Sequence, residues 1–115
     1  MRNIILVLVA INLLSFSDAK PKKAKMRVIV VNSDGQVVEG ASIVVYGSHE
    51  AYEKEVSPVA SAKSNAKGYA EFKGLDEKKY YIHIKKGEAN NNHSHNETDV
   101  LRLKGKNRFE IEIDE

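Results

Sequence analysis

The sequence predicts an all-β domain, specifically a seven-stranded antiparallel β-sandwich. Apolar and polar residues alternate in short segments, turn-forming residues separate these segments, and no segment has a convincing helical period. The absence of cysteine from all 115 residues excludes disulfides, thiol catalysis and cysteine-ligated metal sites, so stability must come from a packed core. A β-barrel is the alternative, because alternation alone does not determine whether a sheet closes.

The first 19 residues have the pattern of a cleaved signal peptide. Arg2 precedes an apolar run over residues 4–14, and Ser17 and Ala19 have the spacing that a signal peptidase accepts. A membrane helix needs about 20 apolar residues, so an uncleaved anchor is the less favoured alternative. Without a cysteine for lipid attachment, we expect a secreted or periplasmic protein that has no stable membrane anchor after signal cleavage.

Residues 20–25, KPKKAK, form a basic leader between the signal peptide and the domain. We expect a flexible, solvated tail, and weak attraction to an anionic lipid or polysaccharide is the second interpretation. No aromatic residue is interleaved with these lysines, which argues against stacking on nucleic-acid bases.

Residues 26–115 divide into strand-like segments and turns. The β-branched segment 26–31 ends at NSDGQ, which predicts a hairpin leading to a second strand over 41–46. SHEAYEKEVSPVA, which could hold a single helical turn, is expected to be a surface loop because of Pro58 and its length. The other expected strands cover residues 59–64, 69–75, 80–85, 99–104 and 108–114, with turns at 65–68 and 105–107 and a polar loop at 87–98.

Two segments, VVNSDGQVVEGASIVVYG and SAKSNAKGYAEFKGLDEKKYYIHIKKG, resemble the carboxypeptidase regulatory-like domain. The shared pattern is a D-G turn, a G-A pair that opens the next strand, a polar-G-aromatic hairpin, a leucine, and a strand that begins with tyrosine. The matching residues are Asp34, Gly35, Gly40, Ala41, Gly68, Phe72, Leu75, Tyr80 and Gly87. It covers residues 26–87 and implies a transthyretin-like (prealbumin-like), Ig-like sandwich without implying an activity. Departures at Ser64, Asn65 and residues 76–79 leave the subfamily open.

The polar loop contains the only stretch with the character of a metal site. His93 and His95 lie two residues apart, so both imidazoles would point to one side of an extended chain and could bind Cu or Zn, with Glu97, His83 or His49 completing the ligand shell. A solvated loop is the alternative interpretation. The same loop contains two N-x-S/T sequences, at Asn92 and Asn96, which would be glycosylation sites in a eukaryotic source.

Catalysis is not expected. Serine, histidine and carboxylates are all present, but no G-x-S-x-G turn marks an activated serine. One enzymatic branch of the transthyretin-like fold hydrolyses hydroxyisourate and ends in a Tyr-Arg-Gly-Ser motif, whereas this sequence ends in FEIEIDE.

The leading hypothesis is a non-catalytic binding module that recognises a protein or glycan partner, and not a nucleic acid, through loops or a sheet edge. Tyr69 and Tyr81, at outward positions of adjacent strands, are the candidate partner contacts, whereas Tyr80 is expected in the core with its hydroxyl bonded to backbone. The alternatives are a small Cu- or Zn-binding protein that uses His93 and His95, and an uncharacterised hydrolase.

Overall fold

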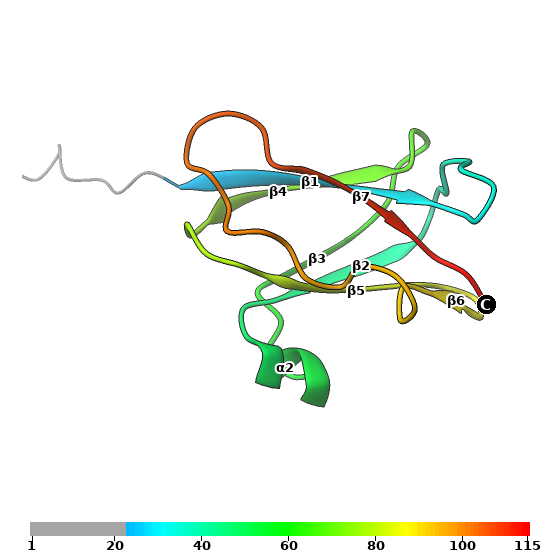
Figure 1. The fold of residues 1–115 in the computed structure, drawn as a ribbon, viewed down its shortest axis with the longest axis horizontal. Coiled ribbons are helices and arrows are strands. Elements are labelled where there is room, and N and C mark those ends of the chain that lie inside the picture. Colours follow the sequence, from blue (N-terminus) through cyan, green and yellow to red (C-terminus); the bar gives the residue numbers. More distant parts are fainter. Residues whose placement is uncertain (1–22) are drawn as a thin grey trace, which may run out of the picture.

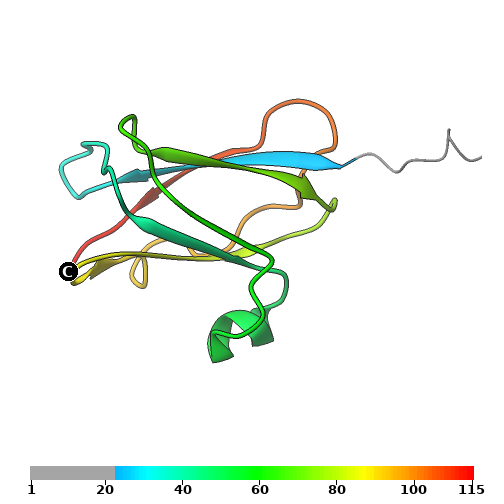
Figure 2. The same cartoon turned by 180° about the vertical axis from the view of Figure 1, so that it is seen from behind.

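The computed structural model describes residues 23–115, which form two packed β-sheets (Figures 1 and 2). The three-stranded sheet has the order β4-β1-β7 and consists of β1 (Ala24–Val31), β4 (Tyr69–Leu75) and β7 (Arg108–Glu112). The four-stranded sheet has the order β3-β2-β5-β6 and consists of β2 (Ser42–Tyr46), β3 (Ala60–Lys63), β5 (Tyr81–Lys86) and β6 (Ala89–Asn90). Seven strands and a sandwich are therefore confirmed.

The signal peptide and residues 20–22 of the basic leader lie outside the described residues. The prediction of a flexible leader is wrong for Ala24 and Lys25, which belong to β1, with Ala24 fully buried. Within residues 23–115, no helix is long and apolar enough to cross a membrane.

Alternation along the strands builds the core, as the sequence predicts. On β1, Met26, Val28 and Val30 point inward and are almost fully buried, whereas Lys25 and Arg27 point outward. The core also contains Ala24, Ala41, Ile43, Val45, Ala70, Phe72, Leu75, Tyr80, Ile82, Ile84, Leu101, Ile111 and Ile113. The prediction for Tyr80 is confirmed, because its buried hydroxyl accepts a 2.8 Å hydrogen bond from the backbone N–H of Asp76.

Of the three predicted hairpins, the one at 105–107 lacks its first strand, and those at NSDGQ and NAKG are crossovers between the sheets. Both turns have the sequence Asn-x-x-Gly, and the Asn32 and Asn65 side chains each accept hydrogen bonds from backbone N–H groups two and four residues later. The turn chemistry is as expected, but the strands on either side separate: β1 and β4 lie in one sheet, and β2 and β3 in the other. A local turn reverses the chain without determining which strands pair.

The prediction of wholly antiparallel sheets is wrong at one position, because β7 runs parallel to the central strand β1, with Arg27 opposite Arg108 and Val31 opposite Glu112. The predicted strand over 99–104 is wrong as well. The segment is a loop in the structure. Leu101 is its one buried apolar residue, and Val100 and Leu103 are exposed. The seventh strand is instead β6, a two-residue strand inside the predicted polar loop.

The predicted surface loop over 48–60 contains a short helix, α2 (His49–Lys54), which lies against the outer face of the four-stranded sheet (Figure 1). Ser48 caps it by accepting a 3.1 Å hydrogen bond from the Ala51 N–H, and Glu55 ends it in a left-handed conformation. Pro58 lies four residues after the helix and does not interrupt it.

Candidate binding surface

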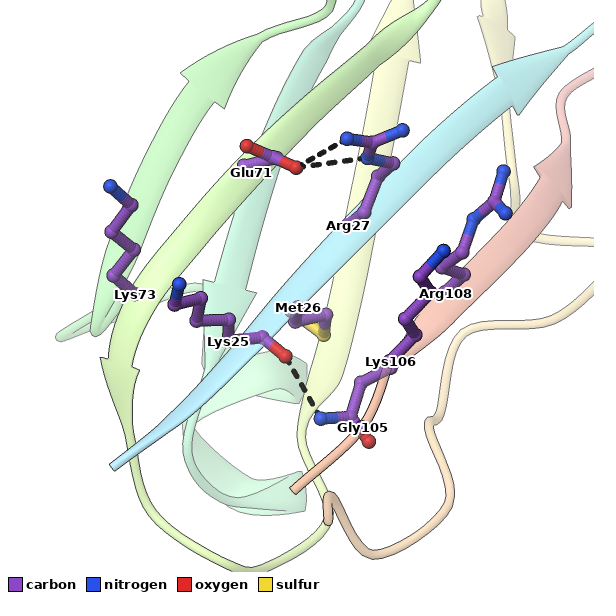
Figure 3. Close-up of a pocket in the computed structure, with 9 residues that line it drawn as sticks. Lys25, Met26, Arg27, Glu71, Lys73, Gly105, Lys106 and Arg108 are labelled. Atoms are coloured by element: carbon purple, nitrogen blue, oxygen red, sulfur yellow. Dashed lines mark hydrogen bonds and ion pairs between the residues drawn. The ribbon is translucent and has the colours of Figure 1, made fainter. Parts of the chain in front are cut away.

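A cavity of about 270 Å³ lies on the outer face of the three-stranded sheet, near the start of β1 (Figure 3). We refer to it as the basic cavity. Its lining consists of Lys25, Met26, Arg27, Glu71, Lys73, Gly105, Lys106, Asn107 and Arg108. Five of these side chains are cationic and one is acidic, which focuses a positive potential in the hollow and favours anionic ligands.

The strand register arranges the cations in two rows across the sheet. Arg27 lies opposite Glu71 of β4 and opposite Arg108 of β7, which gives the first row. The second row lies toward the start of β1, where the β1–β4 register shifts, and consists of Lys73 of β4, Lys25 of β1 and Lys106 of the loop before β7. Neighbouring strands are about 4.8 Å apart, so the first row extends about 10 Å across the three strands.

Arg27 and Glu71 form the main ion pair of the basic cavity. The Nε and Nη2 atoms of Arg27 both donate to one Glu71 oxygen, at 3.0 and 2.6 Å (Figure 3). This hydrogen bond, followed by the charge of Arg27, holds the pKa of the Glu71 carboxyl below its ordinary value, and Lys73 and Lys25 shift the pKa in the same direction. Glu71 is therefore ionised at neutral pH and neutralises part of the cationic charge.

The other four cations, Lys25, Lys73, Lys106 and Arg108, have side chains that make no hydrogen bond or ion pair with any residue in the described range 23–115. Their charged groups are free to contact a ligand.

A buried asparagine holds one wall of the basic cavity in place. Asn107 donates 2.9 Å and 2.8 Å hydrogen bonds to the carbonyls of Lys25 and Arg102, and accepts one of 2.8 Å from the Arg102 N–H. The backbone of Arg27 donates in turn to the Asn107 carbonyl at 2.8 Å. The loop that contains Lys106 is therefore attached to β1 through the Asn107 side chain and one backbone hydrogen bond.

The structure places the two tyrosines predicted as partner contacts on opposite faces of the sandwich. Tyr69 lies on the three-stranded sheet, half-buried beneath the Arg27 guanidinium, whose carbon lies 4.0 Å from the ring centroid. Tyr81 lies on the four-stranded sheet beside α2, with its ring centroid 5.5 Å from that of His49 and 6.2 Å from that of Tyr52. Because β4 and β5 belong to different sheets, the two rings form no common platform.

His93 and His95 lie on the loop after β6, and both side chains are exposed. The Nδ1 atom of His93 is 3.6 Å from a carboxylate oxygen of Asp114, while the backbone carbonyl of His95 accepts a 3.0 Å hydrogen bond from Asn91. Among residues 23–115, no three histidine, aspartate or glutamate side chains are grouped closely enough to hold a metal ion. The structure therefore does not bring His49, His83 or Glu97 to these two histidines as further ligands.

The residues that line the basic cavity were not predicted as a binding site from the sequence. A local signal existed, since Lys25 and Arg27 alternate with buried residues on β1, and Glu71 and Lys73 do so on β4. Alternation shows that these charges face outward, but it does not show that three distant segments meet.

No family model matches the sequence, and no curated protein matches it either. Solved structures that resemble the fold include the TIE protein of Bacillus anthracis, at 16% identity over 83% of this chain and 17% of that one, with a TM-score of 0.61. A mutant of the shaft pilin SpaA from Lactobacillus rhamnosus GG matches at 11% identity over 79% of this chain and 47% of its own, with a TM-score of 0.58. A DUF3823 family protein from Parabacteroides merdae matches at 20% identity over 82% and 47%, with a TM-score of 0.57.

At these identities the likeness shows the β-sandwich fold alone. The chain spans less than half the length of each of these three proteins.

Proposed function

We propose that this chain is an exported, non-catalytic β-sandwich module that binds a protein or glycan partner through the outer face of its three-stranded sheet. The observation that carries the proposal is the basic cavity, where four cationic side chains surround the Arg27–Glu71 pair without internal partners in the described part of the chain. The proposal assigns the chain no catalytic step and no cofactor.

Export is supported by residues 1–19 of the sequence, which have the features of a signal peptide. A surface location also suits the solved structures of similar fold, one of which is a shaft pilin. The resemblance of residues 26–87 to the carboxypeptidase regulatory-like domain is a further part of the proposal, because it implies a sandwich of this kind without implying an activity.

The position of the cavity also supports partner binding through a sheet. Among residues 23–115, β4 pairs only with β1, so its other side is a free edge beside Lys73, where a partner chain could add next to the cavity. A partner could therefore contact the charged side chains of the cavity and also form hydrogen bonds with the backbone at the edge of β4.

The test is an amide-resolved NMR titration of residues 20–115 with a panel of neutral and charged oligosaccharides and extended peptides. We expect a partner to shift the amides of β4 and of residues 102–108, whichever chemical class it belongs to. Shifts confined to α2 and the four-stranded sheet would contradict the proposal, and so would a panel that shifts no amide.

A further inference from the structure

We propose that the ligand of the basic cavity is a linear anionic polysaccharide, in which carboxylate, sulfate or phosphate groups repeat along the chain. This inference rests on the proposed function and names the partner class for the same surface. It follows from three properties of the cavity: the excess of cations, their arrangement in rows, and the kind of surface around them.

The first property is the local charge. The whole chain has 18 basic and 16 acidic residues, so it is nearly balanced, yet the lining of the cavity has five cations and one carboxylate. Two further lysines, Lys20 and Lys22, precede Lys23 in the sequence, and the ammonium group of Lys23 is paired with Asp76 at 2.7 Å. A neutral glycan would leave this concentration of charge without a role, whereas an anionic one uses it for both attraction and orientation.

The second property is the spacing of the cations. A single sulfate or carboxylate reaches only a few donors, but the cations extend from β4 across β1 to β7, a distance of about 10 Å. A chain with anionic groups at regular intervals can cross the strands and contact Lys73 at one side and Arg108 at the other. Once one anionic group has bound, the next groups of the same polysaccharide are held at a high effective concentration near the other cations, so several weak contacts together give a higher affinity.

The third property is the surface itself. Tyr69 is the aromatic residue on this face, and its ring is covered by Arg27, so it offers no free platform for a nucleic-acid base. The apolar residue of the lining, Met26, is buried and available neither for stacking nor for insertion into a lipid layer. Flexible lysines around a hollow therefore suit the carboxylate or sulfate groups of a hydrated polysaccharide better than they suit a nucleic acid or a lipid layer.

The experiment compares two triple variants of residues 20–115 that lower the net charge by the same amount. The first is K25Q/K73Q/K106Q in the cavity. The matched control is K63Q/K67Q/K85Q, whose lysines lie on the four-stranded sheet or at the 65–68 turn, away from the cavity. Each protein is titrated calorimetrically at 0.15 M and 0.5 M salt with dextran sulfate, polygalacturonate and neutral dextran. Vesicles of phosphatidylcholine with phosphatidylglycerol form a separate arm, and thermal melts confirm folding.

We expect the wild type to bind at least one of the two polyanions, with an affinity that falls at higher salt. The cavity variant should bind at least about tenfold more weakly and the control variant within about twofold of the wild type, since three direct contacts are lost only in the first. Equal losses in both variants would overturn the proposal, because they would indicate attraction to net charge rather than to a site.

Vesicle binding that depends on the cavity lysines, without polyanion binding, would also overturn the inference in favour of a lipid surface. Binding of a neutral sugar or a peptide with amide shifts on this face would overturn the inference while leaving the proposed function intact. If no arm binds and no titrated partner shifts these amides, both fail.

Discussion

Glu71 lies among the five cations of the basic cavity and lowers their combined potential. Its oxygen accepts both hydrogen bonds from Arg27, and the paired side chains are still one third to one half exposed. The change Glu71→Gln should therefore raise the affinity for dextran sulfate about threefold or more at pH 7, because it removes a negative charge and releases Arg27. Stability should change little, as is usual for exposed ion pairs. Weaker binding by Glu71→Gln would mean instead that the carboxylate receives hydrogen bonds from the ligand.

The same carboxylate gives a pH dependence with a defined sign. Arg27 lowers the pKa of Glu71 in the folded protein, so the stabilisation from this pair is complete above the ordinary glutamate pKa and is lost as the pH falls through the lowered value. Affinity for dextran sulfate, whose sulfate groups stay ionised in acid, should accordingly rise in the wild type over that acidic range, until it equals that of Glu71→Gln. Titrations of both proteins between pH 7 and pH 3 measure this convergence, and parallel curves would contradict it.

Gly68 and Gly74 both have a positive φ, of 84° and 69°, but their surroundings differ. A Cβ at Gly68 would lie 2.5 Å from the Cβ of Val37, whereas a Cβ at Gly74 would have no atom within 4 Å. Gly68→Ala should cost about 2 to 4 kcal/mol, from backbone strain and overpacking together, and Gly74→Ala only about 1 kcal/mol from strain. Urea unfolding of both variants provides the measurement. Equal costs would show that Val37 moves away without penalty.

At the scale of elements, two buried asparagines attach irregular segments to strands. Asn91 accepts a 2.9 Å hydrogen bond from the Ile84 N–H and donates to the carbonyls of Ile82 and His95. Asn107 likewise makes three side-chain hydrogen bonds to backbone groups of β1 and of the loop before β7. Each amide satisfies backbone groups that would otherwise be buried without partners, so the loops on both sides of the sandwich have fixed positions.

These two residues make a matched pair for a test. Asn107→Ala and Asn91→Ala should each lower the free energy of unfolding by about 2 to 4 kcal/mol, since each leaves buried backbone groups unpaired. Only Asn107→Ala should also weaken polyanion binding, because only its loop carries Lys106 into the basic cavity. Melting temperatures and dextran sulfate titrations, made well below each midpoint, separate the two effects. Similar affinity losses in both variants would show that the cavity responds to overall stability and not to this loop.

At the scale of the whole molecule, the sequence predicted six of the seven strands but not which strands pair with one another. Period-two alternation correctly places Met26, Val28, Ile82 and Ile84 in the core, because inward and outward positions are a local property of an extended chain. Residues 99–104 show the limit of this reasoning. They alternate as a strand would, but the Asn107 side chain replaces the strand partner, and an asparagine's hydrogen bonds are not visible in a hydropathy pattern.

The basic cavity was not predicted for a related reason. Its cations come from three segments, and their proximity depends on β7 lying parallel to β1. Hairpin signals favour antiparallel neighbours, so local sequence gave no reason to place Arg108 beside Arg27. In the same way, Tyr69 and Tyr81 face outward as predicted but on different sheets, because the strands that carry them belong to different layers.

The C-terminal segment joins the two sheets along one side of the sandwich. After β7, the Ile113 N–H donates to the Val31 carbonyl in the first sheet, while Asp114 exchanges two 2.9 Å hydrogen bonds with Asn90 of β6 in the second (Figure 1). Ile113 is almost fully buried between them.

Deletion of residues 113–115 should therefore lower the free energy of unfolding by about 3 to 5 kcal/mol, through loss of the isoleucine side chain and of these hydrogen bonds. Deletion of the exposed Glu115 alone should leave it unchanged within about 0.5 kcal/mol. Denaturant unfolding measures both deletions, and amide exchange at Asn90 reports on the junction itself. Equal stability of the two would mean that the packed core holds the layers together without this segment.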